Sequence, residues 1–328
     1  MAPALDQLIQ RADLDGLVRH VDDTCATRDW EHLVEIRNDA RAAVNTGRQL
    51  WPIATLANYR LALWAPAPFA VRALDDTART FMPGPVSEIL AVHHSWQDLE
   101  PLLEPGHDRG LCAYERALRG DIIAPNEPDI LDIPIALQPW EPAYLCVSYN
   151  DDGVVEEFPA SPQWHERFEV EGIATAPLDE SETIDAFRRM MNAWTSQSNG
   201  TADLAIVEGG PAEALGALGY AGINSELAPI SCSEAWERLT WAASTGGAHG
   251  KRRGVATARS DVWWLFAQIA GMADDWPCDA AECGEIALAC EYYVFRNDKT
   301  PTEGWGLHLV IVDPDEGLSV ALRAHDSL

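Results

Sequence analysis

"DIIAPNEPDILDIPIALQPWEP", residues 121–142, divides this chain of 328 residues into two parts of different character. The stretch holds five prolines, Pro125, Pro128, Pro134, Pro139 and Pro142. Proline lacks a backbone N–H, fixes its own φ and disfavours helix at the residue before it. We therefore predict a proline-rich connector at 121–142, a helical domain over 1–120 and an α+β domain over 143–328.

The part before the connector reads as helices joined by short turns. In "RDWEHLVEIRNDARAAVNTGR" (28–48), Asp29 suits the N-cap, apolar residues recur at helical spacing, and Gly47 suits a left-handed stop. In "WPIATLANYRLALWAP" (51–66), Pro52 suits the first turn and Pro66 lies just past the end.

The part after the connector mixes strands and helices. "YLCVSYNDDGVVEEFP" (144–159) has the turn residues of a hairpin, and "GWGLHLVIVD" (304–313) is apolar enough for a strand. "VATARSDVWWLFAQIAG" (255–271) is the most apolar helix, and "DPDEGLSVALRAH" (313–325) reads as a final helix. The fold class is α+β, with a predominantly helical N-terminal half and a mixed C-terminal half that contains a small sheet.

Composition restricts the partners and the compartment. The net charge of −29 disfavours nucleic acid and anionic membranes as partners. No apolar stretch is long enough to cross a membrane, and the N-terminus lacks the pattern of a signal peptide. The seven cysteines are odd in number and dispersed, which is typical of reduced thiols in a cytoplasm. We expect a cytoplasmic protein. Self-association into a homo-oligomer stays open.

Charge is unevenly distributed along the sequence. Residues 121–185 hold sixteen acidic residues and one base, whereas residues 238–260 hold five bases and no acid. Within that basic island lies "STGGAHGKRRG" (244–254), between two stretches that read as helices. The loop is not a P-loop, because the glycine required before Gly250–Lys251 is replaced by Thr245 and no Ser or Thr follows the lysine. The sequence contains no GxGxxG motif, and we predict no cofactor.

The three cations of the loop precede a helix start, where positive charge is unfavourable. One interpretation is an anion site, because an anion there meets backbone N–H groups, the helix dipole and the cations together. The other is structural, since the same cations follow the end of the preceding helix or pair with the acidic block at 121–185. The candidate anion-binding residues are Gly246, Gly247, His249, Lys251, Arg252 and Arg253.

Metal chemistry has weak support. Asp313, Asp315 and Glu316 at a strand end resemble a carboxylate site for a metal, but the same residues with Pro314 form a helix-capping pattern, so we predict no metal. His93 and His94 are adjacent, which does not place two ligands on one helix face. No nucleophile–base pattern appears, so catalytic residues stay unassigned.

The sequence holds thirteen tryptophans. Tryptophan is a large apolar side chain whose N–H needs a partner. We expect them in the core of the second domain, and the alternative is that some of them line a groove.

The segments "GRQLWPIATLANYRLAL", "STGGAHGKRRG" and "DPDEGLSVAL" resemble parts of an uncharacterised protein family of high-G+C bacteria. The resemblance covers both halves of the chain and implies no activity, cofactor or catalytic residue. Our leading hypothesis is a binding or interaction protein whose basic loop engages a phosphate-bearing ligand or an acidic protein surface. The alternative is an enzyme of phosphoryl or nucleotidyl chemistry that uses His249 with the loop cations. A third, minor hypothesis is an acidic mimic of nucleic acid.

Overall fold

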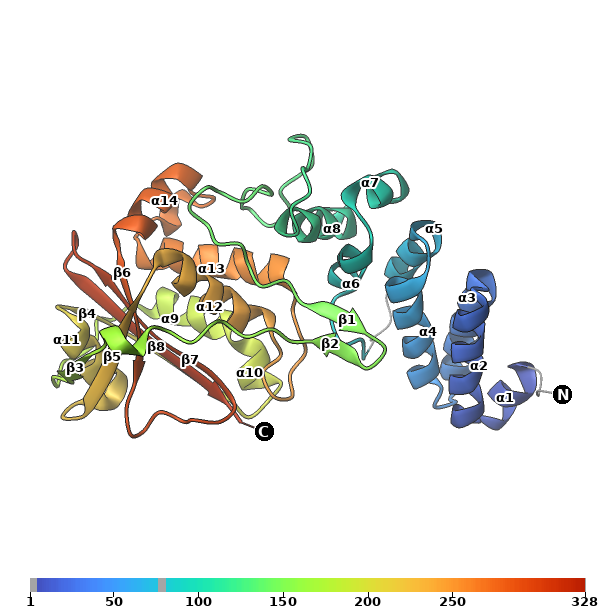
Figure 1. Ribbon diagram of the computed structural model, residues 1–328, viewed down its shortest axis with the longest axis horizontal. Coiled ribbons are helices and arrows are strands. Elements are labelled where there is room, and N and C mark those ends of the chain that lie inside the picture. Colours follow the sequence, from blue (N-terminus) through green and yellow to red (C-terminus); the bar gives the residue numbers. More distant parts are fainter. Residues whose placement is uncertain (1–4, 76–80, 328) are drawn as a thin grey trace. The chain divides into compact units, whose positions relative to one another are not determined.

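The computed structural model describes residues 5–75 and 81–327 (Figure 1). Contacts divide the chain into two compact units. Unit 1 is formed by Met1–Glu127 and Val147–Glu156, and unit 2 is formed by Pro128–Cys146 and Glu157–Leu328. The first crossing between the units lies within the proline-rich stretch 121–142. The segment Val147–Glu156, however, belongs to unit 1, whereas the sequence alone grouped it with the residues after 142.

Unit 1 consists of helices and one short hairpin. Its elements are α1 (Leu5–Arg11), α2 (Leu14–Thr27), α3 (Trp30–Asn45), α4 (Trp51–Trp64), α5 (Ala67–Ala70), η1 (Val71–Asp75), α6 (Val86–His93), α7 (Trp96–Leu99), η2 (Glu100–Leu102), α8 (His107–Leu118), β1 (Ser148–Asn150) and β2 (Gly153–Val155). The helical character predicted for the N-terminal half is therefore confirmed. No helix in the described part of the chain combines the length and apolar character that crossing a membrane requires.

The helix ends of unit 1 follow the sequence signals. The carboxylate of Asp29 caps α3 by accepting a hydrogen bond from the backbone N–H of His32 at 3.2 Å. Gly47 lies just past the end of that helix with a φ of +91°, a conformation that glycine adopts without strain. Pro52 occupies the first turn of α4, where its missing N–H is not needed.

The β1–β2 hairpin supplies polar partners to the helices of unit 1. The hydroxyl of Tyr149 donates to the carboxylate of Glu88 at 2.5 Å, and the Glu88 side chain is fully buried. The hydroxyl of Tyr59 on α4 donates to the backbone carbonyl of Asn150, also at 2.5 Å. A buried carboxylate is costly unless it is hydrogen-bonded. The hairpin is therefore part of the core of unit 1, although residues 128–146 separate it from the rest of that unit in the sequence.

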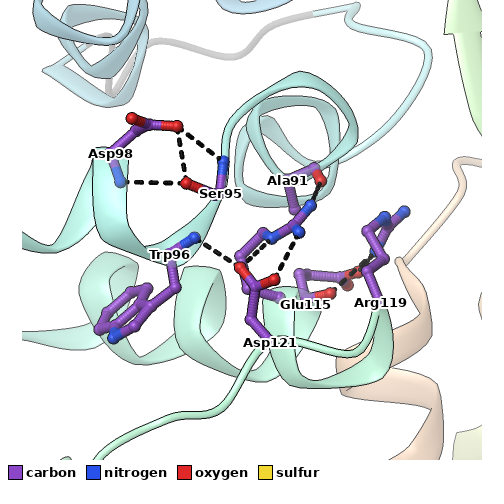
Figure 2. A network of polar contacts seen from close by, with 8 residues as sticks. Ala91, Ser95, Trp96, Asp98, Glu115, Arg119 and Asp121 are labelled. Atoms are coloured by element: carbon purple, nitrogen blue, oxygen red, sulfur yellow. Dashed lines mark hydrogen bonds and ion pairs between the residues drawn. The ribbon is translucent and has the colours of Figure 1, made fainter.

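A second polar network joins α6, α7 and α8 (Figure 2). The guanidinium of Arg116 donates to both carboxylate oxygens of Asp121, at 2.8 and 2.9 Å, and to the backbone carbonyl of Ala91. Asp121 also accepts from the backbone N–H of Trp96 at 2.6 Å. The hydrogen bonds from Arg116 have the largest effect on the pKa of Asp121 and lower it. The hydrogen bond from the backbone N–H of Trp96 lowers it further. The network fixes the three helices against one another.

Unit 2 is a sheet with helices on both faces. Its elements are η3 (Trp164–Glu166), β3 (Phe168–Glu171), α9 (Ser181–Met190), α10 (Asn192–Ser196), β4 (Thr201–Glu208), α11 (Pro211–Leu215), η4 (Gly216–Tyr220), β5 (Asn224–Ile230), α12 (Cys232–Ser244), α13 (Val255–Ile269), η5 (Ala273–Asp275), α14 (Ala280–Ala289), β6 (Glu291–Arg296), β7 (Trp305–Asp313) and β8 (Leu318–Asp326). The six strands pair antiparallel in the order β3-β5-β6-β7-β8-β4. The α+β fold class is confirmed.

Side-chain alternation along β7 shows which helices cover which face of the sheet. Val310 packs with Ala214 and Leu215 of α11. Trp305, which points to the opposite face, stacks on Trp241 of α12 with ring centroids 5.7 Å apart. Figure 1 accordingly shows α11 on one side of the strands and α12 on the other.

The expectation of a final helix at 313–325 is wrong, because these residues form a hairpin turn followed by β8. The carboxylate of Asp313 accepts hydrogen bonds from the backbone N–H groups of Asp315 and Glu316, at 3.0 and 3.1 Å. Gly317 then takes a φ of +66° and starts the return strand. The signal interpreted as a helix cap is thus the signal of a turn, since both use an acidic side chain to bind nearby N–H groups.

The proline-rich segment is anchored in unit 2 by a buried ion pair. The carboxylate of Glu141 lies 2.6 Å from a guanidinium nitrogen of Arg259 on α13, and both side chains are 0% exposed. Burial opposes ionisation of Glu141, but the hydrogen bonds and charge of Arg259 outweigh it and lower the pKa of this carboxyl group. Arg259, a base of the 238–260 island outside the loop 244–254, therefore pairs with Glu141 of the acidic block at 121–185.

Candidate functional site

The glycine-rich loop 244–254 connects α12 to α13 and binds a carboxylate of the protein itself. The backbone N–H of Ala248 donates to Asp326 at 2.6 Å, and the side chain of Asp326 is fully buried. Gly247 has a φ of +64°, and a Cβ built on it would lie 2.2 Å from that carboxylate. Gly246 is also closely packed, because its carbonyl accepts from the N–H of Gly250 at 2.8 Å. The glycines therefore allow the loop to close around Asp326.

The basic residues of the loop occupy different environments. Arg253 forms an ion pair with Asp261 of α13 at 2.6 Å and also donates to the carbonyl of Met190 at 3.1 Å. Arg252 is buried, with an exposed fraction of 7%. His249 and Lys251 are exposed.

Burial raises the pKa of Asp261, although the charge of Arg253 opposes this shift. The ion pair places an acid beside one loop cation, and that acid lies outside the acidic block at 121–185. Asp326 and Asp261, the two carboxylates described at the loop, both belong to unit 2. An external anion at 244–254 stays a prediction.

A cavity of about 260 Å³ in unit 2 has more of the features of a binding site than the loop 244–254 has. Arg238 and Trp241 of α12 line it, and their spacing of three residues places them on the same helix face. The extended segment 158–162 and the first residues of β7 form the other walls. Ligand sites are typically concave and largely apolar, with a few convergent polar groups.

The cavity lies where the sheet opens between β6 and β7. The pairing of these strands ends at Val294 and Leu309, whereas β7 remains paired with β8 as far as Trp305 and Asp326. Residues 305–308 therefore have a neighbouring strand on one side only. An unpaired strand edge carries backbone N–H and C=O groups that are available for hydrogen bonding.

Arg238 is the charged group of the cavity, and its side chain is 8% exposed. The guanidinium donates to the backbone carbonyls of Glu234, at 3.0 Å, and Ala160, at 2.5 Å. Over residues 5–75 and 81–327 no carboxylate forms an ion pair with it. Burial lowers the pKa of Arg238, against the charges of Glu234 and Glu237, but arginine remains charged at neutral pH. The cavity therefore contains a buried positive charge, and the guanidinium has further N–H groups that could donate to a ligand.

Aromatic groups complete the cavity. The indole Nε1 of Trp241 is buried and has no hydrogen-bond partner within the described residues. Phe158 lies against Trp241 and Trp305, with ring centroids 5.7 and 5.1 Å away. Burial, aided by the charges of His325 and Arg323, lowers the pKa of His308 to about 4. His308 is thus neutral at pH 7, and its ring lies 5.4 Å from that of Phe295, on the face of β7 that carries Val310 and not on the face that carries Trp305. Arg238 is therefore the cation that lines this cavity.

Arg238 belongs to the basic island at 238–260 but to none of the sites predicted from the sequence. The available signal was the spacing of Arg238 and Trp241 on one helix face. The other walls come from segments about 70 residues before the start and about 60 residues after the end of α12, so no local pattern indicates the cavity.

Comparison with curated proteins and with solved structures gives no match. Comparison with protein families does give one, over residues 15–327, which span nearly all of both units. The matched family is described as a family of unknown function, which agrees with the resemblance inferred from the sequence segments. The chain therefore belongs to DUF6183, a family of unknown function.

Proposed function

We propose that this protein is a binding protein for a small anionic ligand, and that the ligand enters the cavity beside Arg238. The observation that carries the proposal is a buried guanidinium that lines a cavity and pairs with no carboxylate in the described chain. A buried charge is unfavourable unless it is paired or fully hydrogen-bonded. A carboxylate or phosphate group on a ligand would provide that partner.

The other walls indicate the rest of the ligand. The Trp241 indole has an unused N–H donor, and the rings of Phe158 and Trp305 lie next to it. A flat apolar group carrying the anion would pack on Phe158 and Trp241, which line the cavity, while its anionic end accepts from Arg238. A cavity of about 260 Å³ suits a molecule of roughly one or two rings.

The loop 244–254 is a second place where the same protein would bind an anion. His249 and Lys251 are its exposed groups, and the Arg253 guanidinium forms an ion pair with Asp261. The cavity is favoured over the loop because its cation is buried and has no carboxylate partner within the described residues.

Isothermal titration calorimetry with 3-phenylpropionate and phenyl phosphate tests the proposal, with neutral 2-phenylethanol as the comparison ligand. We expect saturable binding of an anionic probe to the wild type and roughly a tenfold or greater loss in Arg238→Gln, since a hydrogen bond to a charged group is worth about 1.5–3 kcal/mol. Arg188→Gln is the matched control, because Arg188 is an exposed arginine of α9 in the same unit.

Circular dichroism and thermal melting establish that Arg238→Gln is folded before its affinity is interpreted. Unchanged binding in Arg238→Gln together with loss in Lys251→Ala/His249→Ala would move the site to the loop. Failure of the wild type to bind either anionic probe at millimolar concentration would refute the proposal for both places.

A further inference from the structure

Unit 1 contains a groove of about 340 Å³ between one face of α4 and the β1–β2 turn. Trp51, Thr55 and Tyr59 line it from α4, at intervals of four residues that place them on one helix face. Phe81 and Asp152 line it from other segments. We propose that this groove binds an organic cation, an arylalkyl ammonium, independently of the anion site proposed in unit 2.

The apolar wall of the groove is formed by two exposed aromatic side chains. Trp51 is 37% exposed and Phe81 is 64% exposed, and their ring centroids are 4.4 Å apart. A surface on which large aromatic side chains are exposed together is stabilised when a ligand or partner removes it from water. The face of an aromatic ring also attracts cations.

Thr55 provides a polar group inside the groove. Its side chain is 8% exposed, and its hydroxyl has no hydrogen-bond partner among the residues that the structure describes. Buried hydroxyls nearly always have a partner, and threonine in a helix commonly donates to the carbonyl one turn earlier. Thr55 does not form that bond. A ligand that enters the groove and displaces the atoms covering this hydroxyl would supply its missing partner.

The charges at the groove select a cation. Asp151 and Asp152 both line it from the hairpin turn. Asp151 is neutralised in part, because it pairs with Arg60 and accepts from the indole of Trp64 at 3.0 Å. Asp152 is exposed and forms no ion pair within the described part of unit 1. The carboxylates would repel an anion, whereas a cation would be attracted to Asp152.

Together these groups fit a primary ammonium joined by a short chain to an aromatic ring. The ring packs on Trp51 and Phe81, and the ammonium donates to the hydroxyl of Thr55 and to the carboxylate of Asp152. An ammonium has only donors, so it matches two acceptors. The two cavities of the protein would then select ligands of opposite charge.

Titration calorimetry with 2-phenylethylamine at pH 7 tests this proposal, with 2-phenylethanol and 3-phenylpropionate as neutral and anionic counterparts. We expect the ammonium to bind at least roughly fivefold more tightly than the neutral probe. Asp152→Asn and Thr55→Val are each expected to weaken it by roughly fivefold or more. Asp39→Asn, an exposed acid on α3 of the same unit, is the matched control and should bind like the wild type.

Three results would overturn the proposal. These are equal binding of the three probes, no binding of the ammonium at millimolar concentration, and wild-type affinity in either Asp152→Asn or Thr55→Val. Thr55→Val removes a buried hydroxyl that has no described partner, so the variant should fold, and thermal melting verifies this. Because Arg238→Gln leaves unit 1 unchanged, its binding of 2-phenylethylamine separates failure of this proposal from failure of the anion site.

Discussion

Glu141 and Arg259 show how strongly single residues tie the proline-rich segment to unit 2. The carboxylate accepts from the guanidinium of Arg259, from the indole of Trp263 at 2.9 Å and from the hydroxyl of Tyr144 at 2.7 Å. The guanidinium also donates to the carbonyl of Pro134 at 2.6 Å. These partners all belong to unit 2, so the ion pair between Glu141 and Arg259 has a structural role in that unit.

Replacing Glu141 by glutamine should lower the free energy of unfolding by about 3–5 kcal/mol, because it leaves the buried Arg259 charge without its counter-ion. Urea denaturation at pH 7 measures this change. Asp185→Asn breaks an exposed ion pair with Arg188 and should cost less than about 1 kcal/mol. A similar small loss in both variants would contradict the structural role of Glu141.

His308 should make the protein less stable in acid. Its folded pKa of about 4 lies below its ordinary value of 6.5, so between these values the unfolded chain binds a proton that the folded chain does not. Stability due to this group is therefore complete above about pH 6.5 and falls as the pH approaches 4.

His308→Gln should reduce the difference in unfolding free energy between pH 7 and pH 4 by at most about 3 kcal/mol. Denaturant titrations at both pH values measure the difference. His165→Gln, at a side chain that is 70% exposed, should keep the wild-type slope. An unaltered slope in His308→Gln would show that this histidine is not the buried neutral group described here.

At the scale of elements, the loop between α12 and α13 depends on the absence of a side chain at Gly247. Gly247→Ala should destabilise the protein by about 1–3 kcal/mol more than Gly271→Ala. Both glycines have nearly the same positive φ, +64° and +67°, but only at Gly247 does a Cβ meet Asp326. Thermal or urea unfolding of the two variants measures the difference, and equal losses would show that the loop moves away from Asp326 at little cost.

The elements also show where sequence reasoning succeeds. The ends of α3 and α4 were predictable, because Asp29, Gly47 and Pro52 act on the backbone next to them. The strand β8 was not predicted, because it lies between β7 and β4 with its central residues buried on both faces. Such a strand loses the alternation of apolar and polar residues that distinguishes a strand from a helix.

The candidate site depends on contacts that sequence spacing does not carry. Arg238 and Trp241 share a helix face, which is a local property. Their position beside segment 158–162 and the open edge of β7 depends on the sheet order, in which neighbouring strands are often distant in the chain. A basic island marks where the cations are but not which of them lacks a carboxylate partner.

At the scale of the whole molecule, unit 1 is expected to need the segment 147–156. A fragment of residues 1–127 lacks Tyr149, so the buried Glu88 loses its hydroxyl donor. A second fragment would consist of residues 1–127 and 147–156 joined by a flexible linker. It should melt roughly 5 °C or more above the 1–127 fragment. Calorimetry measures both, and Tyr149→Phe in the joined fragment should remove part of the gain. Identical melting of the two fragments would show that the hairpin is not part of the core.

The return of residues 147–156 to unit 1 also sets the order in which a ribosome can deliver a finished protein. Unit 1 cannot complete its core until residues 147–156 have left the ribosome, and by then 128–146 is already outside it. That segment must wait for Arg259, which follows Glu141 by 118 residues, or on the order of ten seconds of translation. During that time residues 128–146 are an acidic, proline-rich segment that cannot form a helix or a central strand. This segment remains hydrated until Arg259 has been synthesised.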